Sequence, residues 1–292
     1  MVSRLRRPNA DLSIELEDGP HRLGKAINGR VTLLPGETFR MRGGKVEFVC
    51  TETYFETVRR TTRMGSAETN ESAATVIRQY SQPIFGDTEI ANLMPQVGDI
   101  DFTLPLDAPP TVQGVVAKIA WHLRATVDVA RARDISHEVE LVVLPAPGES
   151  SGSGSVPSED AAPAVTELAE CDMNLSLAAL RVCMGESVEG VFRIFPKEGF
   201  GPAAARVELM RLEKAGTSQA DRSVGSLEFQ KSEATTTAET LEWSFSLPVP
   251  ECLLATISVH ETSVSWRVRA TVTLSEGKEL EISQRVTVRG SS

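Results

Sequence analysis

Apolar and polar residues alternate along most of this chain, and one alternating stretch occurs twice. Trp121-His122-Leu123-Arg124-Ala125-Thr126-Val127 is matched by Trp266-Arg267-Val268-Arg269-Ala270-Thr271-Val272, 145 positions later. In both stretches every second residue from the tryptophan onward is apolar, which is the pattern of a β-strand with one buried face. A tryptophan on that face suits the space between two packed sheets, so we expect both indoles to occupy equivalent sandwich interiors.

An earlier block is also written twice, at an offset of 161 residues. Apolar positions match apolar positions and glycines match glycines, which predicts three corresponding strands in each copy. In the first copy these strands are expected at 11–16, 24–35 and 45–56, with Val46, Phe48 and Cys50 near the inner face. The matched positions are Asp11, Leu12, Ile14, Leu16, Gly24, Gly29, Val31, Leu33 and Pro35 against Asp172, Met173, Leu175, Leu177, Gly185, Gly190, Phe192, Ile194 and Pro196.

The offset then falls to 143, because Phe102-Thr103-Leu104-Pro105-Leu106 matches Phe245-Ser246-Leu247-Pro248-Val249. The first copy therefore holds 18 more residues than the second between its third strand and this one. We assign the excess to Arg59–Ala74, which is rich in Arg, Thr, Ser, Glu and Asn. Such a polar insertion predicts a long hairpin loop that is mobile unless bound.

Between the copies, the composition changes to Gly, Ser and Pro around Gly148–Ser155, which is typical of a flexible tether. No segment sustains a helical apolar period, and the repeat makes 203–214 a strand rather than a helix. We therefore predict an all-β protein of two tandem immunoglobulin-like antiparallel β-sandwiches. The expected domains are a first sandwich at 1–145, a linker at 146–165 and a second sandwich at 166–292.

Composition and charge narrow the classes of function. The chain has 292 residues, 41% hydrophobic content and a formal charge of −10. Residues 1–145 hold 17 Lys/Arg against 19 Asp/Glu and the rest hold 13 against 21, so the acidic half argues against a nucleic-acid surface. No apolar leader or membrane-length run occurs, and the four cysteines are scattered. We therefore expect reduced thiols and a cytoplasmic protein.

Candidate catalytic chemistry is sparse. His21, His122, His137 and His260 lie in no catalytic motif, and His122 alternates out of phase with the inner face of its strand, so we expect it to face solvent. Asp99, Asp101 and Asp107 flank the Phe102 strand, but their spacing fits no calcium loop and the second copy has no matching acids. We expect no cofactor, no metal and no catalytic residue.

One basic cluster is a candidate for partner binding. Arg59, Arg60 and Arg63 fall in the predicted hairpin insertion, where they could meet an acidic partner, a phosphorylated peptide or a membrane headgroup. The alternative is a solvated loop in which Glu68 and Glu71 balance the charge.

The duplicated landmarks resemble the arrestin-like superfamily, including bacterial sporulation-control proteins. The resemblance rests on the glycine-spaced strand with Gly24 and Gly29, the Phe102-Thr103-Leu104-Pro105 strand followed by Pro109-Pro110, and the Trp121 strand, each with its counterpart in the second copy. It implies tandem arrestin N-like and C-like sandwiches that serve as a non-enzymatic adaptor or scaffold. In arrestins the loop at the position of 59–74 contacts the receptor.

The sequence also departs from the visual-type arrestins. No buried charged cluster and no phosphate-sensing lysine pair can be identified, and Pro109-Pro110-Thr111-Val112 lacks the tyrosine of a ligase-binding motif. The resemblance therefore implies a generic protein-binding adaptor and not receptor desensitisation.

Two other functions remain as alternatives. A β-sandwich module for a carbohydrate or other small ligand would need exposed aromatic side chains, and aromatic residues make up 5% of the chain. A hydrolase would depend on His122 or His137. Peripheral membrane contact also remains open, as does a homodimer formed through unpaired sheet edges.

Overall fold

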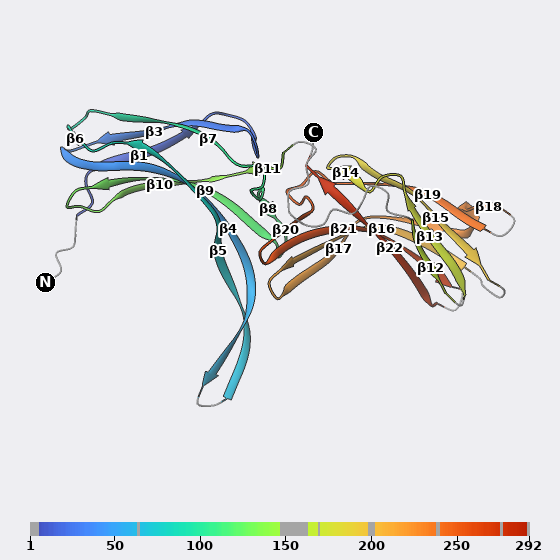
Figure 1. The fold of residues 1–292 in the computed structure, drawn as a ribbon. Coiled ribbons are helices and arrows are strands. Elements are labelled where there is room, and N and C mark those ends of the chain that lie inside the picture. Colours follow the sequence, from blue (N-terminus) through green and yellow to red (C-terminus); the bar gives the residue numbers. More distant parts are fainter. Residues whose placement is uncertain are drawn as a thin grey trace. The chain divides into compact units, whose positions relative to one another are not determined.

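The computed structural model describes residues 6–62, 65–146, 163–168, 170–197, 202–237, 240–274 and 277–290. Over these residues the chain consists of β-strands, apart from turns and one short 3-10 segment at Lys231–Glu233 (Figure 1). All but two of the strand pairings given for the described residues are antiparallel, and the predicted all-β class is confirmed. No helix within these residues has the length and apolar character needed to cross a bilayer.

The chain divides into two compact units. The first comprises Met1–Thr53, Glu71–Gln113 and Lys118–Ala146, and the second comprises the remaining residues. Two short segments of the first sequence repeat, Tyr54–Asn70 and Gly114–Ala117, therefore group with the second unit. Because residues 147–162 lie outside the described part of the chain, the linker expected at 146–165 and the domain limits beside it stay predictions.

The first unit is a sandwich of two antiparallel sheets. The smaller sheet has the order β1-β3-β7 and the larger has the order β10-β9-β4-β5, with β6 paired to β4 and β8 paired to β9, while β2 and β11 form a short parallel pair. The bounds are Ala10–Leu16 (β1), His21–Arg22 (β2), Ala26–Pro35 (β3), Phe39–Thr62 (β4), Gly65–Phe85 (β5), Thr88–Ile90 (β6), Gln96–Thr103 (β7), Val112–Gln113 (β8), Lys118–Val129 (β9), Ile135–Leu141 (β10) and Val143–Leu144 (β11).

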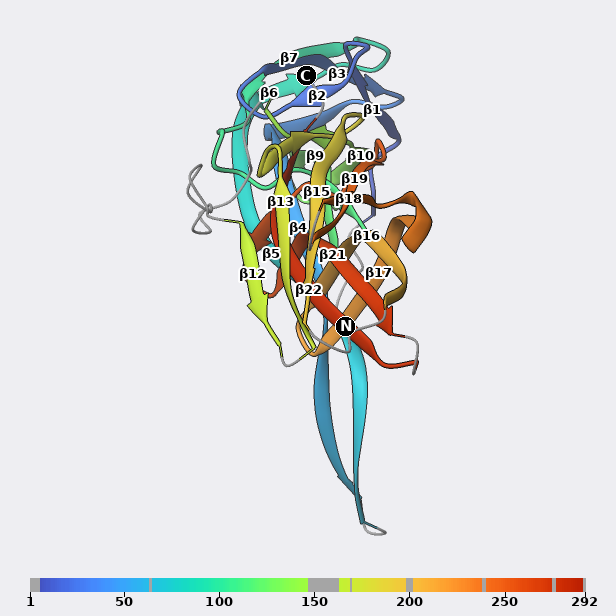
Figure 2. The same ribbon diagram turned by 90° about the vertical axis from the view of Figure 1, so that its right-hand side faces the viewer.

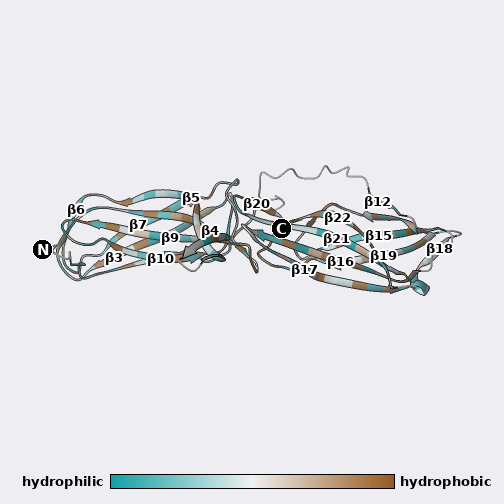
Figure 3. Ribbon diagram, turned by 90° about the horizontal axis from the view of Figure 1, so that it is seen from below, coloured by the Kyte–Doolittle hydropathy of each residue, from teal (hydrophilic) through white to brown (hydrophobic). Residues whose placement is uncertain are grey.

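Aromatic and aliphatic side chains fill the space between these two sheets. Phe48 of β4 stacks on Phe102 of β7, with ring centroids 4.6 Å apart, so the sheets meet face to face. Val46, Phe48 and Cys50 are fully buried, as their alternation predicted, and Trp121 of β9 is buried beside them on the same sheet. Hydrophobic and hydrophilic residues alternate along such strands in Figure 3.

The second unit repeats this arrangement. One sheet has the order β12-β13-β15-β19-β18, and the other has the order β14-β22-β21-β16-β17 with β20 paired to β21. The bounds are Ala164–Glu167 (β12), Cys171–Leu177 (β13), Arg181–Cys183 (β14), Ser187–Pro196 (β15), Pro202–Ala215 (β16), Ser218–Gln230 (β17), Thr235–Thr237 (β18), Thr240–Pro248 (β19), Ile257–Val259 (β20), Thr262–Leu274 (β21) and Glu279–Arg289 (β22).

The two tryptophans occupy equivalent environments. The Trp121 indole N–H donates a hydrogen bond to the backbone carbonyl of Pro109 at 2.8 Å, and the Trp266 indole N–H donates to that of Leu254 at 2.9 Å. In each case the acceptor lies twelve residues before the tryptophan, and both indoles are at most 1% exposed. The prediction of one sandwich core written twice is thus confirmed at the level of single hydrogen bonds.

A threonine in each copy extends this equivalence to the strand ends. Thr111 accepts the backbone N–H of Val143 on its hydroxyl oxygen at 2.9 Å, and Thr256 does the same for Val288 at 2.9 Å. The backbone N–H of each threonine also donates to the carbonyl of the same valine. Both threonines therefore tie the turn after the Phe–Leu–Pro sequence to the last strand of their own sandwich.

The glycine of the second core strand is needed for close strand approach in both copies. A Cβ on Gly29 would lie 2.5 Å from the carbonyl oxygen of Glu15, and one on Gly190 would lie 2.6 Å from that of Ser176. Any side chain there would have to displace the backbone of the neighbouring strand. The matched glycines of the sequence repeat thus mark the same steric requirement.

Candidate partner-binding surfaces

The insertion of the first copy forms strands and not the predicted loop. β4 has 24 residues against 14 in its counterpart β16, and β5 has 21 against 13 in β17, so the 18 extra residues lengthen both arms of one hairpin. Figure 2 shows the arms continuing as a twisted two-stranded ribbon. The Thr57 hydroxyl and the Asn70 amide oxygen form a hydrogen bond of 2.9 Å between the arms. Residues 54–74 are called the ribbon below.

The predicted arginine cluster lies on this ribbon, but the structure describes only part of it. Arg59 is exposed on β4 and takes part in an interaction with its surroundings. Arg60 belongs to β4 with its side chain outside the described residues, and Arg63 lies outside them altogether. The role of these arginines in partner binding therefore stays a prediction.

His122 and His137 lie in settings typical of surface residues. His122 lies on the outer face of β9, as predicted, with Nδ1 3.4 Å from a carboxylate oxygen of Glu138. That carboxylate is also bound by Arg124 at 2.6 Å, so it forms part of an ion-pair cluster across β9 and β10. His137 is exposed on β10. These contacts hold neighbouring strands together and give no sign of a base poised beside a nucleophile.

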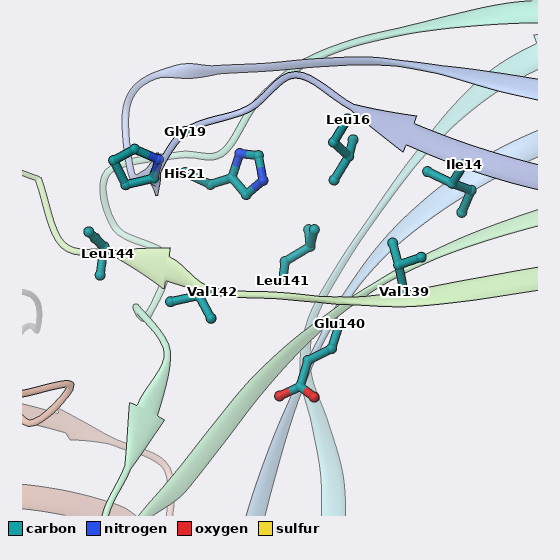
Figure 4. Close-up of a pocket in the computed structure, with 10 residues that line it drawn as sticks. Ile14, Leu16, Gly19, His21, Val139, Glu140, Leu141, Val142 and Leu144 are labelled. Carbon is teal, nitrogen blue, oxygen red and sulfur yellow. The ribbon is translucent and has the colours of Figure 1, made fainter.

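A cavity of about 360 Å³ opens beside His21 in the first unit (Figure 4). Its wall is mostly aliphatic, with Ile14 and Leu16 on one side and Leu141 on the other, and the side chain of Glu140 points away from it. Burial lowers the pKa of His21, which keeps the imidazole neutral. None of the ten lining residues is Phe, Tyr or Trp, so the cavity lacks the stacking platform of a carbohydrate site.

The two cysteines of the cores are protected from reaction, and the described acids form no metal site. All four cysteines are free thiols. Burial raises the pKa of Cys50 to about 12 and that of Cys171 to about 11, which suppresses the reactive thiolate. Among the described residues, no His, Cys, Asp and Glu side chains gather as a metal site would require.

The second unit contains a buried charge cluster that the sequence analysis missed. Glu213 of β16 is 1% exposed and pairs with Arg211 at 2.8 Å. Its other carboxylate oxygen accepts the backbone N–H groups of Val115, Val116 and Ala117 at 2.6, 3.1 and 3.4 Å. Val115, Val116 and Ala117 come from the first sequence repeat but belong to the second unit, as Glu213 does. Their hydrogen bonds to the Glu213 carboxylate therefore hold this segment in the second unit.

The sequence repeat contained one indication of this cluster. Glu213 lies 161 residues after Glu52, and both continue the alternation of buried residues on their strand, after Val46, Phe48 and Cys50 in the first copy and after Val207, Leu209 and the charged Arg211 in the second. Glu52 is also fully buried. A carboxylate written twice on the inner phase of a strand predicts a satisfied buried acid, because an unpaired one would be too costly.

Comparison with known families identifies the first part of the chain. Residues 11–147 match the family described as "Arrestin (or S-antigen), N-terminal domain". No curated protein matches the chain. Arrestins are generally non-catalytic, and the matched residues contain the first sandwich with its tryptophan and its hairpin. The chain is therefore arrestin-like over residues 11–147, which match the N-terminal domain of arrestins.

Proposed function

We propose that this arrestin-like chain is a non-enzymatic adaptor that binds partner proteins, and that the ribbon is one of its binding elements. The observation that carries this proposal is the lengthening of one hairpin in one of two otherwise equivalent sandwiches. The second sandwich closes the same hairpin at Ala215 and Ser218. The extra length is therefore not required for folding this type of core.

The free-energy cost of ordering the ribbon supports the same proposal. A two-stranded ribbon in water is marginal, because it buries little apolar surface against the entropy of ordering its backbone. The described ribbon side chains beyond Thr57 are largely exposed. An element that contributes little to the core and presents two polar strands is suited to contact with another chain, through side chains or through added strand pairing.

Shortening the ribbon tests the proposal directly. Residues 58–69 are replaced by an Asn-Gly turn, so that Thr57 and Asn70 keep their hydrogen bond and the hairpin closes as in the second sandwich. Partners captured from the native cell are identified by affinity purification and mass spectrometry. We expect the shortened protein to unfold at the temperature of the wild type and to lose at least one partner.

Charge reversal tests whether partner binding needs the arginine side chains in addition to the ribbon backbone. The variant carries Arg59→Glu, Arg60→Glu and Arg63→Glu, and its matched control carries Arg222→Glu and Arg285→Glu at exposed positions of the second unit. Loss of a partner in the first variant alone assigns the contact to the arginines. A shortened, folded protein that retains every wild-type partner would remove the ribbon from the proposal.

We further propose that the protein works in the cytoplasm. The four free thiols, two of them fully buried, support a reducing compartment. Fractionation of native cells, with detection of the untagged protein, measures this, and recovery from an oxidising compartment would contradict it.

A further inference from the structure

One end of the first unit gathers four segments that are distant in sequence. Backbone hydrogen bonds of 2.8–3.2 Å join them in a row, and we call residues 6–9, 35–38, 91–95 and 130–134 the loop end. It lies beside β6, at the left of Figure 1. The bonds run from the N–H of Leu93 to the carbonyl of Pro35, from Gly36 to Asn9, and from Arg133 to Arg6.

An apolar patch lies exposed at this end. Leu93 is 71% exposed and Met94 is 59% exposed, in the turn between β6 and β7. Val97 and Leu34 are 54% and 44% exposed. Val97 pairs with Thr32, and Leu34 lies two residues after Thr32 on the same strand, so both side chains lie on the outer face of the small sheet. Four large apolar side chains thus point away from the core in neighbouring positions.

The backbone of this patch is strained. Leu93 has φ of 60°, in the left-handed region that bulky residues avoid, and Arg131 of the same loop end has φ of 61°. They are two of the three non-glycine residues with positive φ in the described chain. A leucine that adopts this conformation gains no burial from it, which is the pattern of a residue held outward for contact.

The same loop end also carries exposed basic side chains. Arg7, Arg131 and Arg133 are exposed, and none of them forms an ion pair within the described residues, although Asp134 lies next in the chain. The other arginines nearby are neutralised by Glu37, Asp87 and Asp128, which pair with Arg6, Arg40 and Arg42. In a protein of net charge −10, this local surplus of arginine is unusual.

We propose that the loop end of the first unit binds an anionic lipid surface, with Leu93 and Met94 entering the interface and Arg7, Arg131 and Arg133 contacting the headgroups. The combination of a few protruding apolar side chains with flanking arginines is the arrangement that interfacial binding requires. Four side chains are too few for a stable protein interface, which buries about 800 Å² per partner. This inference is independent of the ribbon and its partners.

Vesicle flotation with the full chain tests the proposal. Vesicles of phosphatidylcholine alone are compared with vesicles that also contain phosphatidylserine, at low and at physiological salt. We expect the wild type to float only with the anionic vesicles and to bind less at higher salt. Arg131→Gln with Arg133→Gln should weaken binding roughly five-fold for each arginine.

The apolar contribution is tested with Leu93→Asn and Met94→Gln. Asparagine tolerates the left-handed region, so this variant should keep or raise the unfolding temperature while it loses vesicle binding. The matched controls are Val165→Asn, at a position 61% exposed in the second unit, and Arg222→Gln with Arg285→Gln. We expect both controls to bind vesicles like the wild type.

Three results would overturn the proposal. The first is wild-type protein that does not float with anionic vesicles. The second is a folded Leu93→Asn/Met94→Gln variant that floats as well as the wild type. The third is concentration-dependent self-association in sedimentation velocity that the same variant abolishes while vesicle binding persists, which would assign the patch to a second copy of the chain.

Discussion

Replacing each core tryptophan by phenylalanine provides a paired test of the duplicated sandwich. Trp121→Phe and Trp266→Phe each remove an indole N–H that donates to a buried carbonyl twelve residues earlier. Each also leaves a cavity where the second ring of the indole stood. Because the two environments match, the two substitutions should destabilise their own sandwiches by similar amounts.

The magnitude follows from these two losses. A buried carbonyl left without its donor costs about 1–3 kcal/mol. Phenylalanine is smaller than tryptophan by roughly 40 Å³, which at about 24 cal/mol per Å³ adds about 1 kcal/mol. We therefore expect about 2–4 kcal/mol for either variant. Each ring also has one further contact, since the Arg211 guanidinium lies 5.7 Å from the centre of Trp266 and the Tyr80 ring stacks on Trp121 with centroids 6.3 Å apart, so the two values should stay close.

Amide hydrogen exchange measures each unit separately, which avoids assuming that the chain unfolds in one step. Protection of the β9 amides should fall roughly 30-fold to 900-fold in Trp121→Phe, and protection of the β21 amides should fall as much in Trp266→Phe. Fluorescence of the remaining tryptophans, which include Trp243, reports whether the fold is retained. An effect on one sandwich alone, or two effects more than tenfold apart, would refute the equivalence.

Three further predictions follow from the buried groups. Gly114→Ala should destabilise the second unit by about 1–3 kcal/mol in thermal unfolding, because its Cβ would lie 2.1 Å from a carboxylate oxygen of Glu213; an unchanged melting temperature would contradict this. Burial raises the pKa of Glu208, but Arg269 and neighbouring donors lower it by more, so the pKa in the folded protein lies below its ordinary value. The ionised carboxylate therefore stabilises the folded protein above the ordinary pKa of a glutamate, and this stabilisation is lost as the pH falls through the lowered pKa. Glu208→Gln should flatten the acid side of the stability curve, and an unchanged acid limb would refute the assignment. Cys50 should resist iodoacetamide in mildly alkaline buffer until urea unfolds the first unit, as mass spectrometry of the peptide would show; labelling of the native protein would contradict its burial.

Much of the fold was predictable because the chain provides its own comparison. A single copy of the Trp121 strand is one alternating stretch among many, whereas two copies at a constant offset mark which positions must be apolar. The matched glycines behave likewise: Gly29 alone suggests a bulge, but with Gly190 it indicates a steric requirement, which the strand contacts confirm. Comparing the two copies thus distinguishes residues that the core requires from residues that only favour a local conformation.

The ribbon was mispredicted because no second copy exists there. Its polar composition indicates a loop when each residue is judged by hydrophobicity. Threonines at Thr57, Thr61, Thr62 and Thr69 favour extended backbone, however, and two long paired strands satisfy each other's hydrogen bonds without a core. In this segment, backbone pairing determines the structure more than side-chain burial does.

The buried acid cluster shows a different limit of sequence reasoning. Glu213 occupies an inward position of β16, and only its partners make that position tolerable. Arg211 lies two residues away, but the other partners lie about one hundred residues earlier in the chain, in Gly114–Ala117, a segment that contains no charge. The acceptor could be suspected from alternation, but these distant donors are backbone N–H groups, which every residue except proline carries. Such a contact is visible only in the folded chain.

The comparison of the two copies also supports the proposal that the ribbon binds partners. The tryptophan hydrogen bonds, the threonine ties and the close-packed glycines are equivalent, so they explain folding and cannot explain why one copy differs from the other. The differences between the described parts of the two copies include the ribbon of the first copy, and the strand β12 beside β13 and the strand β18 beside β19 in the second copy. Each of these alters an edge or extends a hairpin at the surface, while the cores remain matched. Selection for the stability of the core does not explain why the hairpin of one copy is longer by 18 residues. The proposed recognition of a partner does explain it.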